Sequence, residues 1–170
     1  MSYLLITPFF PTKSSFVGSY LLDQAKEINK QTNSDFKVIV IESILSDKQD
    51  YIIEGISCFV FRKIDFPSFF LPGFFQKWNN YRFLNFLKSK NIKVDDNTVC
   101  HGHITYPAMP FLTLVKNKFK SKTILQHHGL DILQFDTCKK EEKCTRRPRV
   151  LLGDALYSIH RIFRCLFANY

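Results

Sequence analysis

Short runs of apolar residues recur along the chain, and between them apolar positions return every three or four residues. The uninterrupted runs, rich in Val, Ile, Leu and Phe, indicate strands that are buried on both faces. They lie at residues 3–7, 36–41, 56–61, 98–101 and 122–127. The segments with helical spacing lie at residues 17–31, 75–87 and 108–119. This alternation predicts an α/β fold with a Rossmann-like parallel sheet and helices on both faces.

The crossovers between these strands also predict their order. Parallel strands joined by right-handed crossovers commonly take an order in which the first and fourth strands lie side by side, that is, 3-2-1-4-5. Ligands bind where the winding direction reverses, outside the carboxyl ends of the strands. The loops at these ends lie at residues 8–18, 101–107 and 127–131.

Composition and charge narrow the class of protein. The 170 residues are 45% hydrophobic and 23% charged, which fits a compact globular fold. Lys and Arg number 24 against 15 Asp and Glu, and the net charge of +9 favours anionic partners: nucleic acid, phosphate-bearing small molecules or acidic lipid. Five cysteines without regular spacing argue against a disulfide framework and favour a reducing, cytoplasmic compartment. No apolar run reaches the roughly 18 residues that a membrane-spanning helix needs.

The first loop, TPFFPTKSSFVGS, lacks the G-x-G-x-x-G pattern of dinucleotide-binding enzymes, which argues against a nicotinamide oxidoreductase. Its glycine, Gly18, stands at the entrance of the first predicted helix. There the missing Cβ lets a ligand approach the backbone, and a helix N-terminus attracts phosphate or carboxylate. A glycine needed only for the turn is the alternative interpretation.

Histidines follow the fourth predicted strand in the segment CHGHITYP. His101 and His103 point to the same side if the strand continues through them. Zinc is one interpretation, and the side chains that could complete such a site are His127, His128, Cys138 and Cys144. The C-x5-C spacing of the cysteines is unusual for structural zinc. We therefore expect no metal, and we favour neutral imidazoles that hydrogen-bond a loop backbone or substrate hydroxyls.

The segment QHHGLD follows the fifth predicted strand and is the most specific stretch of the sequence. It places His127, His128, Gly129 and Asp131 where ligand-binding groups belong in an α/β sheet. A capped turn uses the same residues, with Gly129 at a positive φ and Asp131 as the N-cap of a short helix. Both interpretations stay open.

Taken together, TPFFP and a glycine before a helix, HGH at the fourth strand and HHGLD at the fifth resemble the N-terminal half of family-4 glycosyltransferases of the GT-B type. The resemblance covers essentially the whole chain. It implies a retaining hexosyltransferase without metal or other cofactor, which transfers a sugar from a nucleotide sugar to an acceptor. It also implies that residues 1–150 form the acceptor-side domain and that residues 151–170 begin a helix toward a donor domain missing from this sequence. The chain alone is then expected to be inactive.

The resemblance also assigns roles to residues. His128 matches the family histidine that sits over the transferred sugar, and it is the catalytic candidate, with a positioning role. Gly18 matches the glycine that lies against the phosphate and sugar of the donor, and His103 matches the histidine that closes the fourth strand. The full substrate-binding set is Gly18, His103, His127, Gly129 and Asp131.

Aromatic residues crowd the middle of the chain. Residues 59–86 hold nine of the 18 phenylalanines. Prolines and Gly73 interrupt any helix before Phe74, so aromatics there lie on a loop beside a basic helix. Such a surface suits anionic lipid or a lipid-linked acceptor, and its predicted contacts are Phe69, Phe70, Phe74, Lys77, Trp78 and Arg82. The alternative is a core-packing helix with a solvated basic face.

Two classes of function follow. The first is the acceptor-binding half of a glycosyltransferase of polysaccharide biosynthesis, cytoplasmic or peripheral on the inner face of the membrane, with a saccharide or lipid-linked acceptor. The second is a non-catalytic module that binds membrane or polyanion through residues 59–86 and 137–149. Nucleic acid is not an expected partner, because the basic run KKEEKCTRRPR has no spacing typical of nucleic-acid-binding folds.

Overall fold

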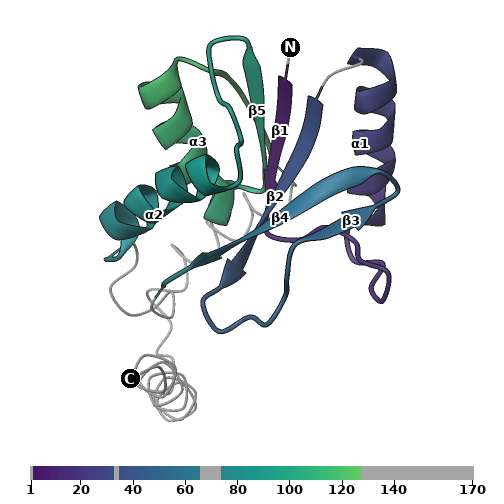
Figure 1. Cartoon of the computed structure of the whole chain (residues 1–170), viewed down its shortest axis with the longest axis horizontal. Coiled ribbons are helices and arrows are strands. Elements are labelled where there is room, and N and C mark those ends of the chain that lie inside the picture. Colours follow the sequence, from purple (N-terminus) through teal and green to yellow (C-terminus); the bar gives the residue numbers. More distant parts are fainter. Residues whose placement is uncertain (1, 33–34, 66–73, 128–170) are drawn as a thin grey trace, which may run out of the picture.

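Strands and helices alternate through the part of the chain that the structure describes. The computed structural model describes residues 2–32, 35–65 and 74–127. Its strands are β1 (Ser2–Thr7), β2 (Asp35–Ser43), β3 (Tyr51–Ile53), β4 (Ile56–Lys63), β5 (Thr98–His103) and β6 (Lys122–Gln126). Its helices are α1 (Ser19–Thr32), α2 (Gln76–Ser89) and α3 (Thr105–Phe119). Over these ranges the chain is a Rossmann-like α/β fold (Figure 1), which confirms the fold class that the apolar pattern predicts.

The order of the strands confirms the predicted topology. The strands form one sheet in the order β3-β4-β2-β1-β5-β6, in which the five parallel strands follow the expected 3-2-1-4-5 arrangement. β1 pairs in parallel with both β2 and β5, so that Leu5 lies between Val38 and His101. The winding direction therefore reverses between β1 and β5.

One edge of the sheet contradicts the prediction that all strands are parallel. β3 runs antiparallel to β4, and Tyr51 pairs with Cys58. The two residues between these strands, Glu54 and Gly55, both have positive φ, which is the hairpin geometry that matches the twist of the strands. The usual sequence signal for such a turn is Asn-Gly or Asp-Gly, and Glu in the first position conceals it.

The predicted loop at residues 101–107 is shorter in the structure. β5 continues through His103, and α3 begins at Thr105 rather than at residue 108. Tyr106 has an extended backbone inside the first turn of α3, because a residue that precedes proline avoids the helical conformation. The two histidines of β5 therefore belong to a strand and lie on the same face of the sheet, as predicted for a strand that continues through them.

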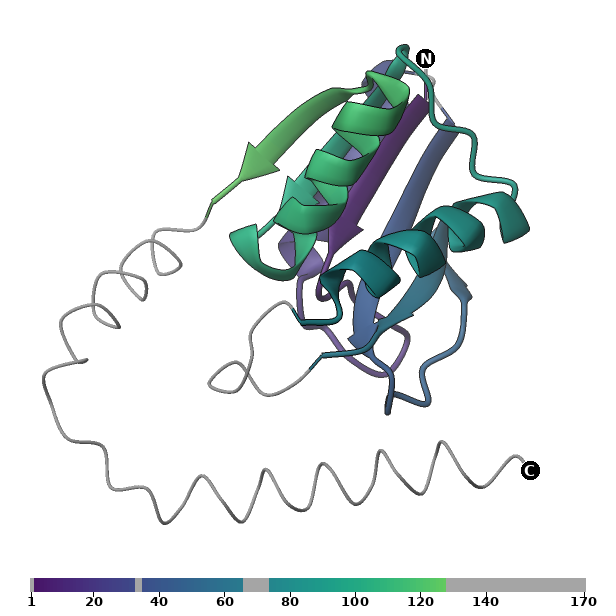
Figure 2. The ribbon, with the colours of Figure 1, turned by 90° about the vertical axis from the view of Figure 1, so that its left-hand side faces the viewer.

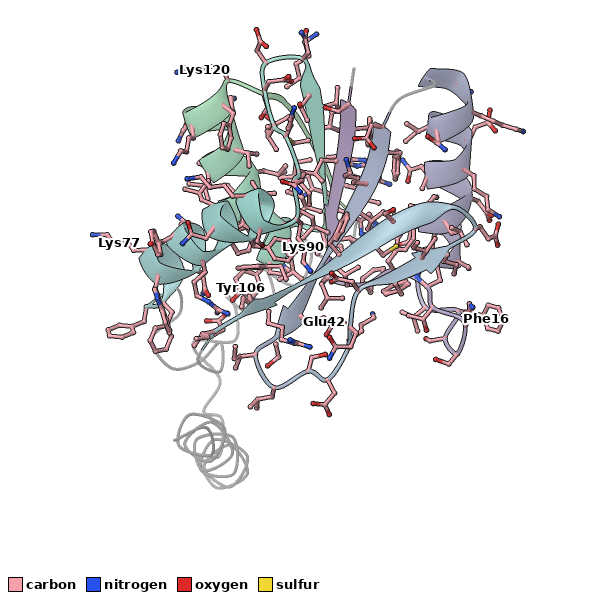
Figure 3. The ribbon with its side chains drawn as sticks, in the orientation of Figure 1. Phe16, Glu42, Lys77, Lys90, Tyr106 and Lys120 are labelled. Atoms are coloured by element: carbon pink, nitrogen blue, oxygen red, sulfur yellow. The ribbon has the colours of Figure 1, made fainter. Side chains whose placement is uncertain are left out.

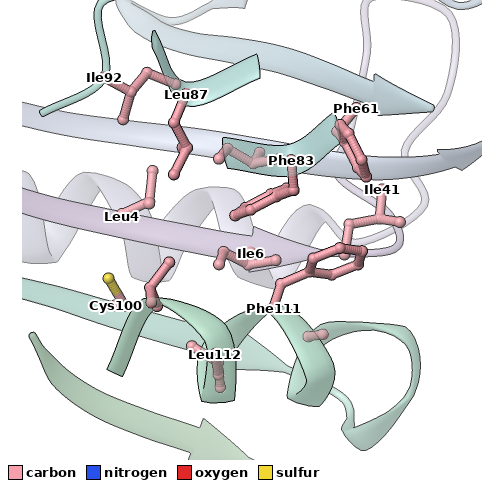
Figure 4. Close-up of a cluster of buried hydrophobic side chains, with 13 residues drawn as sticks. Leu4, Ile6, Ile41, Phe61, Phe83, Leu87, Ile92, Cys100, Phe111 and Leu112 are labelled. Atoms are coloured by element: carbon pink, nitrogen blue, oxygen red, sulfur yellow. The ribbon is translucent and has the colours of Figure 1, made fainter. Parts of the chain in front are cut away.

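Each face of the sheet carries a hydrophobic core. On one face, Leu5 of β1 packs in a cluster with Leu21 of α1. α2 and α3 cover the other face (Figure 2). There, Leu4 and Ile6 pack in a cluster with Phe83 of α2 and with residues of α3 (Figure 4). Neighbouring residues of β1 alternate between the two cores because side chains of a strand point alternately to its two faces. The prediction of helices on both faces is confirmed.

Several phenylalanines of the aromatic-rich segment lie in the core beneath α2 and α3. The rings of Phe83 and Phe111 have centroids 4.6 Å apart. Phe61 contacts both rings edge-on, at 5.1 and 5.4 Å, and Phe86 packs against Phe61 at 5.3 Å. Core packing accounts for these rings, as the alternative interpretation of the segment proposes.

Candidate functional site

The loop between β1 and α1 begins with a turn that a side chain stabilises. Thr7, the last residue of β1, is buried, and its hydroxyl donates to the carbonyl of Phe9 over 2.8 Å. The same oxygen accepts a hydrogen bond from the Phe9 amide over 3.3 Å. These two bonds fix the backbone of Phe9, whose ring connects the first loop to the end of β5.

Gly18 ends this loop and directly precedes α1. Its φ is +82°, and a Cβ at this position would lie 2.9 Å from Cδ2 of Phe9. Both the conformation and the close approach of the ring require glycine. The turn interpretation therefore explains Gly18 structurally, and its contact with a ligand stays a prediction.

His103, the last residue of β5, is completely buried beside this loop. Its Nε2 shares a hydrogen bond of 3.1 Å with the hydroxyl of Tyr20 on α1. The ring of Phe9 packs edge-on against the imidazole, with centroids 5.3 Å apart. The first loop, α1 and β5 therefore meet at His103, and Tyr20, 46% exposed, extends the contact to the surface.

His101 lies two residues earlier on the same face of β5. It is buried, and its Nδ1 shares a hydrogen bond of 2.9 Å with the hydroxyl of Tyr3 on β1. Burial lowers the pKa of His101, and the side chain of Gln126 opposes this effect in part. The imidazole is therefore neutral at pH 7, which is the state that the hydrogen-bonding interpretation of these histidines needs.

Further polar side chains belong to this cluster, and the sequence-based prediction missed their roles. Gln24 of α1 donates to the side-chain oxygen of Gln126 on β6 over 3.4 Å, and the side chain of Gln126 also hydrogen-bonds His101. Tyr20 and Gln24 are four residues apart and share a helix face, which is a signal in the sequence. In that pattern, however, Tyr20 resembles a core-facing apolar position, and nothing local connects it to His103.

The backbone after His103 has a strained conformation. Ile104 has φ +70° and ψ 137°, a region that β-branched residues avoid. Its amide donates to the carbonyl of Gln126 over 3.0 Å. Such strain persists only where the surroundings hold it, and it is concentrated at functional sites. The ends of β5 and β6 are therefore the edge of the sheet where ligand binding is expected.

One of the residues predicted to act after β6 falls within the described ranges. His127 directly follows β6 and is exposed. The catalytic candidate His128, together with Gly129 and Asp131, lies outside those ranges. The structure brings His103 together with the loop that contains Gly18, through the ring of Phe9. The role of His128 stays a prediction.

A metal centre was the alternative interpretation of the histidines. Within residues 2–32, 35–65 and 74–127, no three His, Cys, Asp or Glu side chains lie where they could jointly hold a metal ion. His101 and His103 each share one ring nitrogen with a tyrosine hydroxyl. Three other candidate ligands of that interpretation lie outside the described ranges, namely His128, Cys138 and Cys144.

The predicted membrane or acceptor surface falls partly on α2. Phe74, just before the helix, is 65% exposed and Trp78 is 47% exposed, and Lys77 projects away from the ribbon (Figure 3). Arg82 is only partly exposed, because its guanidinium lies 5.5 Å from the centre of the Trp78 ring. The other two predicted contacts, outside the described ranges, are Phe69 and Phe70. No helix in the described part of the chain is long and apolar enough to cross a bilayer.

Comparisons with known proteins add no assignment. No protein-family model, no curated protein and no solved structure matches this chain. The resemblance to family-4 glycosyltransferases therefore rests on the residues quoted above.

Proposed function

We propose that this chain is the acceptor-binding half of a retaining glycosyltransferase that transfers a hexose from a nucleotide sugar to a saccharide or lipid-linked acceptor. The observation that carries the proposal is the junction of the Gly18 loop, Tyr20 and buried His103, next to the point where the sheet reverses its winding. Open α/β sheets bind ligands at such a point. The HGH and HHGLD segments add the resemblance in sequence.

The groups at this junction suit a ligand that is rich in hydroxyls and carries phosphate. The hydroxyl of Tyr20, held by Nε2 of His103, can donate to or accept from a sugar hydroxyl. α1 begins at Ser19 without an acidic side chain in its first turn, so the positive end of its dipole favours an approaching anion. In the proposed reaction a nucleoside diphosphate leaves. Aimed donors stabilise that leaving group, and no nucleophile on the protein is required.

The nucleotide sugar is a substrate in this proposal, and neither a metal nor a resident cofactor takes part. A complete enzyme of this kind also needs a donor-binding domain. Binding of the acceptor is therefore the property to test on this chain, and sugar transfer is the property to test on the complete enzyme.

Acceptor binding by the full chain tests the proposed function. We expect binding to oligosaccharides or lipid-linked saccharides on a glycan array, and we expect Tyr20→Phe to weaken it roughly three- to tenfold through the loss of one hydrogen bond. Tyr81→Phe is the matched control, because Tyr81 is an exposed phenol on α2. Equal binding by the two variants, or no saccharide binding by the unsubstituted chain, contradicts the proposal. In the complete enzyme, sugar transfer that survives His128→Ala contradicts the catalytic role of that residue.

A second candidate function, a non-catalytic membrane-binding module, is favoured by a different observation. Phe74 and Trp78 expose aromatic surface on and beside α2, close in sequence to Lys77. Aromatic and basic side chains together suit an anionic bilayer surface. Cosedimentation with anionic vesicles should be lost when Phe74 and Trp78 are both replaced by Ser. It should persist for Phe16→Ser, which removes an exposed ring from the first loop (Figure 3). Unchanged cosedimentation of the double variant rejects this function.

A further inference from the structure

A groove lies beside β4, at the place where β3 stops covering its edge. β3 pairs only with Ile56, Ser57 and Cys58 of β4. Beyond them, an open groove of about 760 Å³ is lined by residues 60–62 of β4, the segment after β2 and α2. This volume lies in the range of small-molecule sites. The groove shares no lining residue with the junction of Gly18, Tyr20 and His103.

Positive charge predominates in the lining of this groove. The charged side chains that line it are Lys48, Asp50, Arg62, Arg82 and Lys90. Lys90 contacts Asp50 over 2.6 Å, and the other carboxylate oxygen of Asp50 accepts the amide of Val60 over 2.8 Å. Lys48 pairs with Glu42 over 3.1 Å. Both lysines are therefore neutralised by carboxylates, and the two arginines are the excess charges.

Neither arginine has a carboxylate partner within the described ranges. Arg62 donates from Nε to the carbonyl of Ser46 over 2.9 Å and from Nη2 to the carbonyl of Lys48 over 2.8 Å. Its guanidinium is thereby held in one position without losing its charge. Arg62 of β4 and Arg82 of α2 both line the groove.

The most specific feature of the groove is the environment of the Arg82 guanidinium. Its guanidinium lies near two aromatic rings, 5.9 Å from the centre of Phe61 and 5.5 Å from the centre of Trp78. Its Nη1 is buried, and in the described part of the chain it has no hydrogen-bond partner. A buried donor without a partner is unfavourable, more so when it is charged. Rotation of the guanidinium toward the groove would give this N–H an acceptor if an anion were bound there.

We propose that this groove binds a phosphate or diphosphate group, with Arg82 as the bidentate donor and Arg62 as the second cation. A guanidinium presents N–H groups in a fixed plane that matches two oxygens of a phosphate. The two aromatic rings limit the plane in which Arg82 can turn. The proposal does not depend on the glycosyltransferase function, because the groove and the junction are separate sites.

Calorimetric titration of the full chain with inorganic pyrophosphate at low ionic strength tests the groove. We expect binding at one site, and we expect Arg82→Gln to weaken it roughly tenfold or more, the loss expected for a charge-assisted hydrogen bond. Lys88→Gln is the matched control, because it removes one positive charge from an exposed position of the same helix that does not line the groove. An equal loss in both variants, which indicates only general attraction of anions, overturns the proposal.

A measurement on the unsubstituted chain covers the case in which Arg82→Gln fails to fold. The side-chain Nε–H resonance of Arg82, assigned by its absence in Arg82→Lys, should shift on addition of pyrophosphate. Vesicles that contain phosphatidylglycerol separate the two sources of phosphate. A shift with pyrophosphate identifies a soluble phosphate ligand, and a shift with vesicles alone identifies a lipid headgroup. No shift with either probe overturns the proposal, whereas the saccharide binding that depends on Tyr20 is unaffected by that outcome.

Discussion

Replacement of Gly18 by Ala tests whether the first loop is built around the ring of Phe9. Gly18 and Gly55 have nearly the same positive φ, +82° and +81°. A Cβ on Gly18 would meet Cδ2 of Phe9 at 2.9 Å, and a Cβ on Gly55 would meet nothing within 4 Å. Gly55→Ala is therefore a matched control, because it introduces the same backbone strain without the contact.

The expected losses of stability follow from the strain of the positive φ and from the contact with the Phe9 ring. Alanine in a left-handed conformation costs about 1–2 kcal/mol, so Gly55→Ala should lower the free energy of unfolding by about that amount. Gly18→Ala should add an overpacking cost of about 1–3 kcal/mol against Phe9. Displacement of Phe9 should also disturb its edge-on contact with His103. We therefore expect Gly18→Ala to weaken saccharide binding as well, and Gly55→Ala to leave it unchanged.

Urea unfolding of the full chain, followed by circular dichroism, measures the free energy of unfolding of both variants. The comparison requires that the slope of this free energy against urea concentration is the same for both. A double-mutant cycle with Phe9→Ala isolates the contact. In the Phe9→Ala background, Gly18→Ala should destabilise only as much as Gly55→Ala does. Equal costs of the two glycine substitutions in the unsubstituted chain would refute this reasoning, and so would a cost of Gly18→Ala that does not change when the ring is removed.

Three further predictions concern buried groups. Burial lowers the pKa of His101 in the folded chain, so the stability that neutral His101 contributes should be fully present above the unfolded-state pKa of about 6.5. The free energy of unfolding should fall as the pH drops toward the folded-state pKa, by at most about 1.4 kcal/mol per pH unit. If the urea midpoint of His101→Gln has the same pH dependence as that of the unsubstituted chain, this prediction is contradicted. Asn79→Ala should lower the free energy of unfolding by about 2–5 kcal/mol. The Asn79 side chain accepts a hydrogen bond from the Ile64 amide over 2.9 Å and donates one to the Ile64 carbonyl over 2.5 Å. A loss below about 1 kcal/mol in urea unfolding would show that water replaces these hydrogen bonds. Gly102→Ala should destabilise the chain by about 1–3 kcal/mol, since its Cβ would lie 2.3 Å from Cδ1 of Leu112, and thermal unfolding should show a smaller loss when Leu112→Ala is already present.

The order of the parallel strands could be predicted because its causes are local. Continuous apolar runs identify strands that are buried on both faces, and right-handed crossovers then leave few possible orders. β3 escaped the prediction because Tyr51–Ile53 is too short to show a period, and because Glu54 stands where the usual hairpin turn has Asn or Asp. The early start of α3 escaped it because Pro107 resembles a helix breaker, although proline is tolerated in the first turn of a helix.

At the candidate site, the sequence indicates where polar groups gather but not how they pair. Gly18, His101 and His103 stand at the ends of predicted elements, so their position at the sheet edge follows from chain order and strand polarity. The contact of His103 with Tyr20 joins residues 83 positions apart. It depends on how closely α1 packs on the sheet, which no local pattern contains.

The elements, the strand order and the edge of the sheet at which the parallel strands end are thus set by short-range patterns, because apolar spacing and chain direction act within a few residues. Only the tertiary structure decides that Phe9 occupies the space above Gly18. The same holds for Arg82, which the sequence assigns to an exposed basic face and which packing places near both Phe61 and Trp78 with a buried N–H. These contacts depend on the close packing of side chains from distant segments, because a small shift of one element changes the side chains that it contacts.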